Sequence, residues 1–315
     1  MEPIIIRKPS SCTVLKQCSA LKIVLGEIRD AVHIKSLSTI ISERLVIYFL
    51  CGQCIIFYNP YGVINAKPLI GTNIRSATDN EFPSVVSIQL ICAHQTPVEQ
   101  HVCTGTLISK NDVLTAEHCL SDANNFNSVR ISMGTVDLNR NTHGYVAWWL
   151  TYVAWASQRQ VQITHYQNDI AIIRLTADIP NGLTPSLMPF LTNYDLYQED
   201  VTMAGWGKLR NGTTSRIMQT VDLKVLTQHE CNDRISRLRG TPSNLEEIFV
   251  CTAKQPFVIL GKGDSGGPLF FDDDLVAINK ATAPALDHVN QEEKVNIHIN
   301  ITFYRRFIVH VRLYL

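Results

Sequence analysis

The sequence has no excess of either charge, no apolar run long enough to span a membrane, and no repeated or low-complexity segment. Its 28 basic residues balance 28 acidic ones, so no basic stripe of the kind that binds nucleic acid is present. The most apolar stretch, 45–58, is about 14 residues long, which is short for a membrane span. We therefore expect neither nucleic acid nor, in the mature form, a membrane as partner.

Residues 1–68 lack the organisation of the rest of the chain and are interpreted as an N-terminal extension. The start is not typical of a signal peptide, because Arg7 and Lys8 follow the first apolar residues. The stretch 45–58 has the length of a signal-peptide core, with a buried strand as the alternative, and a pro-segment would follow it. The nine cysteines favour a compartment that permits disulfides.

From Glu81 onward, short runs rich in Val and Ile alternate with turn residues. This texture predicts an all-β chain of many short strands. The expected strands are 84–91, 106–108, 129–133, 161–163, 170–175, 201–204, 220–225 and 275–278. The one long helix that we expect is 302–315, at the end of the chain.

The most informative segment is 263–268, which reads GDSGGP. Three glycines and a proline around Ser265 make a poor helix and a poor strand, and instead favour a tight turn that exposes the hydroxyl. Acyl transfer needs such a nucleophile, with N–H donors placed where an oxyanion forms. A glycine-rich surface loop is the alternative, and two upstream segments argue against it.

These segments are 114–119 (LTAEHC) and 168–175 (NDIAIIRL), which place His118 and Asp169 before Ser265. In this hypothesis His118 takes the Ser265 proton and returns it to the leaving amine. Asp169 holds His118 in the productive tautomer, although a turn residue before a strand would look the same. The N–H groups of Gly263 and Ser265 would form the oxyanion hole. We expect no cofactor and no metal.

The order His, Asp, Ser, together with the segments 103–108 (CTGTLI), 204–207 (AGWG) and 296–308, resembles the chymotrypsin-like (trypsin-fold) serine proteases. The resemblance runs from about residue 69 to about 308 and implies a protease domain over 69–315. It implies two packed six-stranded antiparallel barrels with a short C-terminal helix. It also implies a secreted, extracellular enzyme that acts on proteins or peptides, with an activating protease and protein inhibitors as further partners.

The resemblance assigns roles to residues outside the triad. Asp264 would form the activation salt bridge with a newly cut N-terminal amine, and 69–72 (LIGT) looks like a weakened form of the mature start. The family's disulfides would join Cys103 to Cys119 and Cys231 to Cys251. Closing loops of this length typically stabilises a fold by about 2–4 kcal/mol each.

The substrate pocket departs from the family. Ile259 stands at the pocket base where trypsin-like members carry Asp, and Thr282 and Asn296 would narrow the slot. Lys280, Ala281 and Thr282 replace a Ser-Trp-Gly wall, Gly261 replaces a cysteine, and Glu117 precedes His118 where alanine is usual. Two hypotheses follow: a serine endopeptidase that cleaves after apolar residues, chymotrypsin- or elastase-like, or a catalytically impaired protease-fold binding or regulatory protein.

Overall fold

The computed structural model describes residues 69–315, except for 72, 124, 210 and 286–290. Our expectations for 1–68, including the signal core at 45–58, lie outside the described residues. Within the described part of the chain, no helix is long and apolar enough to cross a membrane.

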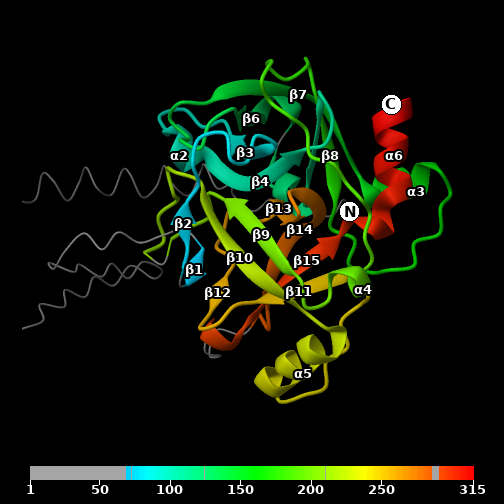
Figure 1. Ribbon diagram of the computed structural model, residues 1–315. Helices are drawn as coiled ribbons and strands as arrows, with labels where there is room; N and C mark the ends of the chain where they lie inside the picture. The colour runs from blue at the N-terminus through cyan, green and yellow to red at the C-terminus, as the bar shows by residue number, and fades with distance from the viewer. Residues whose placement is uncertain (1–68, 72, 124, 210, 286–290) are drawn as a thin grey trace, which may run out of the picture. The chain divides into compact units, whose positions relative to one another are not determined.

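Six antiparallel strands from the first half of the described chain close into a barrel (Figure 1). Their order around the barrel is β3-β4-β5-β8-β7-β6. Val, Ile and Leu side chains fill the interior and are almost completely buried. The strands are β3 (Val85–Leu90), β4 (His101–Leu107), β5 (Asp112–Thr115), β6 (Val129–Met133), β7 (Thr142–Thr151) and β8 (Ala171–Leu175).

A second antiparallel barrel follows, in the order β11-β15-β14-β13-β9-β10, and a β10–β11 pairing closes it. The short strand β2 (Arg75–Ser76) extends this sheet at β10, while β1 (Ile70–Gly71) pairs only with β12 (Val258–Ile259). The barrel strands are β9 (Asp200–Gly205), β10 (Gln219–Leu226), β11 (Phe249–Ala253), β13 (Pro268–Phe271), β14 (Asp274–Ala283) and β15 (Val295–Asn300).

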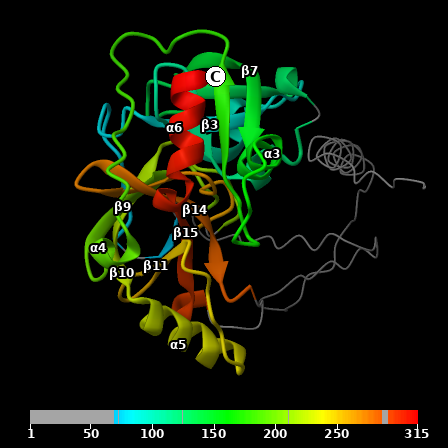
Figure 2. The same cartoon turned by 90° about the vertical axis from the view of Figure 1, so that its right-hand side faces the viewer.

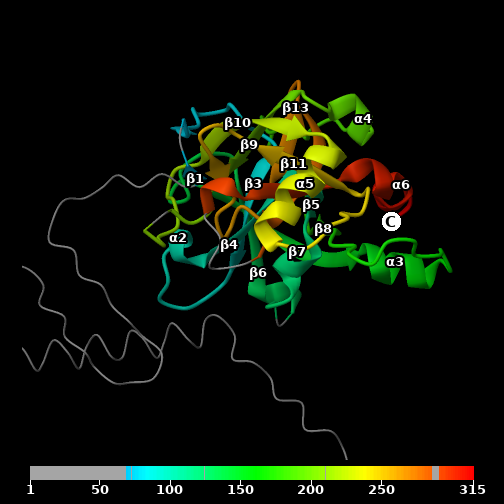
Figure 3. The ribbon, with the colours of Figure 1, turned by 90° about the horizontal axis from the view of Figure 1, so that it is seen from below.

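The helical segments lie at the ends of strands. The α-helices are α2 (Pro97–Gln100), α3 (Tyr152–Gln158), α4 (Asn193–Leu196), α5 (Gln228–Arg239) and α6 (Arg305–Tyr314). The 3₁₀ turns are η1 (Glu117–Leu120), η2 (Phe126–Ser128), η3 (Gln291–Glu293) and η4 (Ile301–Tyr304). In the view from below, α5 lies in front of the second barrel, and α6 and α3 lie together at the right (Figure 3).

Helix α6 leaves the second barrel and packs beside α3 of the first (Figure 2). Its buried face carries Phe307, Ile308 and Val311. The Trp155 indole N–H donates to His310 Nδ1 at 3.2 Å, and the Arg174 guanidinium donates to the Val311 carbonyl at 3.2 Å. The end of the chain therefore ties the two barrels together.

The structure confirms the prediction of two six-stranded antiparallel barrels with a short C-terminal helix. The predicted strand at 161–163 is wrong, because these residues form an irregular connection after α3. Helix α5 was missed, although the Thr227–Glu230 capping box and Gly240 in the left-handed conformation mark its two ends.

Candidate functional site

His118 and Asp169 meet because strands β5 and β8 are neighbours, with Thr115 opposite Ala171. His118 lies in η1, just after β5, and Asp169 lies just before β8. The His118 backbone N–H donates to Asp169 Oδ1 at 2.9 Å, and His118 Nδ1 lies 2.8 Å from Asp169 Oδ2. Two hydrogen bonds therefore fix the carboxylate against the histidine ring and leave Nε2 on the other side.

Asp169 is held as a carboxylate. Burial by itself would raise its pKa, but the hydrogen bonds from His118 and the nearby charges of His118 and Lys280 hold the pKa well below its usual range. The side chain of Asp169 is 13% exposed, whereas that of His118 is 44% exposed. The geometry presents a partly solvated imidazole on a buried anion, which suits a general base.

The Ser265 turn lies between β12 and β13 and packs against the end of β5. The Ser265 carbonyl accepts a hydrogen bond from Thr104 N at 2.9 Å and lies 3.6 Å from Cys119 Sγ, next in sequence to His118. Within the described residues, the Ser265 hydroxyl makes no hydrogen bond to the His118 ring. The Ser265 backbone therefore lies close to Cys119, the sequence neighbour of the expected base. Catalytic hydrogen bonds are often long before substrate binds, which accounts for the missing Ser265–His118 hydrogen bond.

Glycine at 266 is required by this close approach. Gly266 has a φ of +74°, and an added Cβ would lie 2.1 Å from Thr115 Oγ1 and 2.6 Å from the Thr104 carbonyl. We expect Gly266→Ala to reduce the free energy of unfolding by about 2–4 kcal/mol and to displace Ser265, since backbone strain and a clash add. Denaturant unfolding measures the first effect and labelling by a fluorophosphonate measures the second.

Gly240→Ala is the matched control for Gly266→Ala. Gly240 has a nearly equal φ of +71°, but an added Cβ there meets nothing within 4 Å. We expect this variant to lose only about 1 kcal/mol, the cost of the left-handed backbone, and to keep its labelling. Equal losses in the two variants would show that the contact with β5 is unimportant.

Two amide groups beside Ser265 are free to bind an anion. The N–H groups of Gly263 and Ser265 donate to no acceptor among the residues that the structure describes. An unpaired backbone N–H group that is shielded from water costs free energy. Two such groups in one turn therefore favour the binding of a hydrogen-bond acceptor from outside the chain. The positive φ of Gly263, +101°, is a conformation that side-chain-bearing residues rarely adopt.

A buried histidine that the sequence did not single out holds this turn. His101 Nε2 lies 3.2 Å from the Gly263 carbonyl, and His101 Nδ1 lies 2.8 Å from Ser87 Oγ. Burial lowers the pKa of His101 to about 4, so the ring is neutral at pH 7. A carbonyl can only accept, so Nε2 carries the proton. Thr104 Oγ1 also donates to the Gly263 carbonyl, at 2.9 Å.

Asp264 is buried without a cation. Its carboxylate accepts hydrogen bonds from Gly207 N and Gly261 N, each at 2.8 Å. Burial raises the pKa of Asp264 to about 7, although these two backbone donors oppose the rise. No salt bridge to this carboxylate exists within the described part of the chain. Leu69, at the expected mature start, is 1% exposed. It immediately precedes β1, which pairs with β12.

The residues expected at the base of the substrate pocket are buried. Ile259 is 3% exposed and lies opposite Ile70 in the β1–β12 pair. Asn296 is completely buried, donates to the Val258 carbonyl and accepts from Leu260 N, both at 2.9 Å. Thr282 lies opposite Asn296 in the β14–β15 ladder and is half-buried. The Asn296 side chain therefore joins the backbone groups on either side of Ile259.

A groove runs beside β14, with a volume of about 390 Å³. Apolar side chains form much of its wall, and Lys280 and Arg239 supply positive charge. The apolar lining residues are Ile235, Leu245, Phe249, Ala281, Ala283, Pro284, Ala285 and Ile297.

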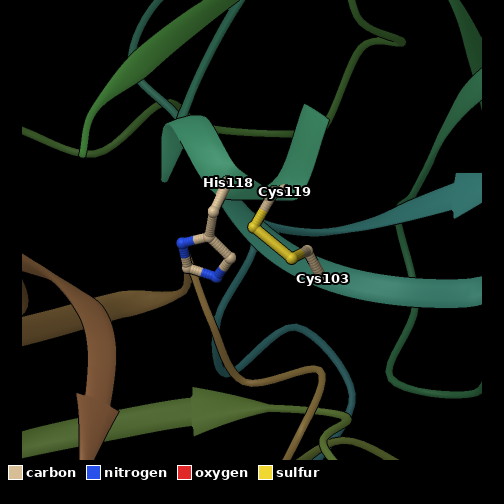
Figure 4. Close-up of side chains that lie close together, drawn as sticks. All are labelled: Cys103, His118 and Cys119. Atoms are coloured by element: carbon tan, nitrogen blue, oxygen red, sulfur yellow. A yellow bond between two sulfur atoms is a disulfide. The ribbon is translucent and has the colours of Figure 1, made fainter. Parts of the chain in front are cut away.

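Two disulfides lie in the positions expected from the resemblance: Cys103–Cys119 and Cys231–Cys251. Figure 4 shows His118 beside the first of them. The side chains of Cys103, His118 and Cys119 approach one another closely enough to suggest a metal site. Both sulfur atoms are bonded to each other, however, so this grouping offers a metal ion only one ligand.

Lys280, which helps to line the groove beside β14, also makes a contact that the sequence did not predict. Its Nζ lies 3.0 Å from Asp169 Oδ2. No local pattern in the sequence signals this contact, because the two residues are 111 positions apart.

Comparisons with known proteins agree with the fold. A sequence model of the trypsin family matches residues 72–308. The chain is 30% identical over 225 residues to a venom serine protease of Polistes dominula, covering 68% of this chain and 71% of that protein. It is 27% identical over 197 residues to trypsin iota of Drosophila melanogaster, covering 62% of this chain and 71% of that protein.

Among solved structures, neuropsin, a serine protease of mouse brain, superposes with a TM-score of 0.60. It is 21% identical in sequence and matches over 76% of this chain and 99% of its own, so it supports the fold alone. The family match extends over more than half of the chain. The chain therefore belongs to the trypsin family of chymotrypsin-like serine proteases.

Proposed function

We propose that this protein is a secreted serine endopeptidase in which Ser265 is the nucleophile, His118 the general base and Asp169 its anchor. The observation that carries the proposal is the His118–Asp169 pair, joined by two hydrogen bonds, beside a turn with two unpaired N–H groups. A single pairing of His with Asp is common, but the added anion site is typical of acyl transfer.

In the proposed reaction His118 Nε2 takes the Ser265 proton as Oγ attacks the scissile carbonyl carbon. The N–H groups of Gly263 and Ser265 bind the oxyanion, and Asp169 stabilises the imidazolium that forms. His118 then gives its proton to the leaving amine, and water hydrolyses the acyl-enzyme by the same steps in reverse. Labelling of Ser265 by a fluorophosphonate tests the proposal directly, because it reports both the nucleophile and the oxyanion hole.

The proposed substrates are proteins or peptides with a small apolar side chain before the cleaved bond. Ile259 supplies no carboxylate to pair with a substrate Arg or Lys side chain. The buried Asn296 side chain would limit the depth of the proposed substrate pocket. The apolar groove beside β14 would contact the residues that precede the cleaved bond. Secretion is supported by the two disulfides and by the likeness to a venom serine protease.

We further propose activation by cleavage before Leu69, by another protease. The supporting observations are the buried Asp264 carboxylate, which has no cation beside it among the described residues, and the burial of Leu69. A new α-amine at Leu69 would form an ion pair with Asp264. This ion pair would hold the turn that contains Gly263 and Ser265 in one conformation. Protein inhibitors that occupy the cleft of the active form would be further partners.

The uncleaved chain should lose stability as the pH rises from about 4 to about 7. A carboxyl whose pKa is raised to about 7 binds its proton more tightly when folded than when unfolded, so its contribution falls across that window. Urea unfolding at pH 5, 6, 7 and 8 measures the slope, and Asp264→Asn should flatten it. Equal slopes in both proteins would contradict an unneutralised Asp264.

The competing function is a binding or regulatory protein that has lost efficient turnover. The observations that favour it are the Lys280 contact with Asp169 and the lack of a Ser265–His118 hydrogen bond within the described chain. Absence of fluorophosphonate labelling after verified cleavage before Leu69 would select this function.

A further inference from the structure

Lys280 occupies a β-bulge that directs its side chain at the catalytic carboxylate. The β14–β15 register shifts between Asn279 and Ala281, which leaves Lys280 without an opposite residue. Bulges re-aim a side chain relative to its strand. The Lys280 side chain is 19% exposed, and its Nζ also lies 5.7 Å from the centre of the Phe249 ring. The ammonium group is therefore held in place.

The position of this ammonium group opposes one part of the proposed reaction. Lys280 Nζ and His118 Nδ1 lie 3.0 Å and 2.8 Å from the same atom, Asp169 Oδ2. Asp169 must stabilise the cation that forms on His118 during attack. A second cation on the same oxygen repels that imidazolium, so Lys280 alone would weaken the base.

Glu117 supplies a charge that offsets Lys280. It precedes His118 in η1 and is partly buried. Burial first, and then the charge of Asp169, raise the pKa of Glu117, while the charge of Lys280 lowers it. The N–H of the peptide bond that joins Glu117 to His118 donates to Asp169 Oδ1 at 2.9 Å, which places the Glu117 backbone beside the same carboxylate. With Glu117 ionised, Lys280 and Glu117 cancel, and the surroundings of His118 keep the single net negative charge of Asp169.

The other titratable groups around this couple are neutral or more distant. Tyr304, from η4, faces Asp169 and donates a hydrogen bond to Asn168 Oδ1 at 2.9 Å. Burial raises the pKa of Tyr304, so its hydroxyl keeps its proton at neutral pH. Glu246 pairs with His165 at 3.3 Å. Among the residues that the structure describes, this leaves Glu117 and Lys280 as the two added charges beside His118 and Asp169.

We propose that Lys280 and Glu117 are positioning residues that form a charge-compensating pair around the His118–Asp169 couple. Lys280 fixes the Asp169 carboxylate by a third contact, and Glu117 restores the negative charge that Lys280 removes. The functional part of this inference rests on the proposed protease activity, but the electrostatic part does not.

The test is the protonation of the His118 ring, followed by NMR on the full chain labelled with [¹³Cε1]-histidine. Lys280→Met removes a positive charge, so the imidazolium is favoured and the titration midpoint moves to higher pH. Glu117→Gln removes a negative charge, so the midpoint moves to lower pH. We expect each shift to be about 0.5–1 pH unit, and the double variant to return close to the wild type. The spectrum of His118→Gln identifies the resonance.

Lys262→Met is the matched control. Lys262 is exposed, lies in the turn that carries Ser265, and has no contact with Asp169, so its removal should leave the midpoint unchanged. Lys280→Arg keeps the cation and should stay close to the wild type, which covers the case in which Lys280→Met fails to fold. Shifts of the same sign in the two single variants, or no shift in either, would overturn the charge-compensating pair.

The rate of fluorophosphonate labelling against pH separates this inference from the proposed function. For an active enzyme, the acid limb of the rate profile should move with the NMR midpoint in each variant. Opposite NMR shifts without any labelling would retain the charge pair and reject the endopeptidase. Labelling of every variant with one unchanged pH profile would retain the endopeptidase and reject the pair.

Discussion

Ser265→Ala and His118→Ala should each remove nearly all amide hydrolysis from the activated protein. The members of a triad act as a unit, so the loss of one costs on the order of 10⁶ in turnover, about as much as the loss of all. In the proposed reaction, the His118 ring held by Asp169 can act as a base only on the Ser265 hydroxyl. Single-turnover and steady-state assays on a peptide amide measure the effect.

The fold should survive both substitutions. Ser265 and His118 are partly exposed and lie outside the two barrel cores, so each variant should unfold within about 1 kcal/mol of the wild type. Wild-type turnover by Ser265→Ala would mean that a different residue is the nucleophile. Loss of folding in either variant would make the activity comparison invalid and call for Ser265→Cys instead.

Peptides with Arg before the cleaved bond should be cut at least about 10³-fold less efficiently than matched peptides with Ala or Leu. An unpaired guanidinium beside Ile259 carries a desolvation cost of several kcal/mol, which sets this factor. Phe should also be disfavoured, because Asn296 bridges the base of the slot. The values of kcat/KM for four peptides that differ only in this residue decide the order.

A preference for Arg would show that Ile259 does not form the pocket base. The partner variant is Asn296→Gly, which removes the bridging side chain and should raise kcat/KM for Phe relative to Ala. The substitution leaves Leu260 N and the Val258 carbonyl without their side-chain partners. Its stability must therefore be measured alongside, and the ratio of the two substrates is the informative quantity.

The motifs around His118, Asp169 and Ser265 were readable from the sequence because each is local and their order is distinctive. The all-β class followed from many short apolar runs, since a strand needs only a few alternating residues. The two barrels were implied only by the resemblance to the trypsin-fold proteases. The prediction of a strand at 161–163 was wrong. These three residues follow a helix, and no neighbouring strand pairs with them among the described residues. Local pattern predicts which residues are apolar, but not which backbone lies beside them.

The contacts that distinguish this protein were not readable in the same way. His101 reaches the Gly263 carbonyl across 162 positions, and the orientation of Lys280 depends on a register shift in one ladder. A one-residue bulge turns a side chain to a new direction, and its position depends on tertiary pairing. For Glu117, the departure from the family was visible, but its meaning required the position of Lys280.

The tie between the C-terminal segment and the first barrel also has a consequence during protein synthesis. Tyr304 bonds to Asn168, beside Asp169, and Ser265 and Lys280 also belong to the last part of the chain. A ribosome therefore releases His118 and Asp169 long before it makes the residues that complete their surroundings. An emerging chain carries the proposed base without its proposed nucleophile, so translation itself delays the site until the residues up to Tyr304 have been made.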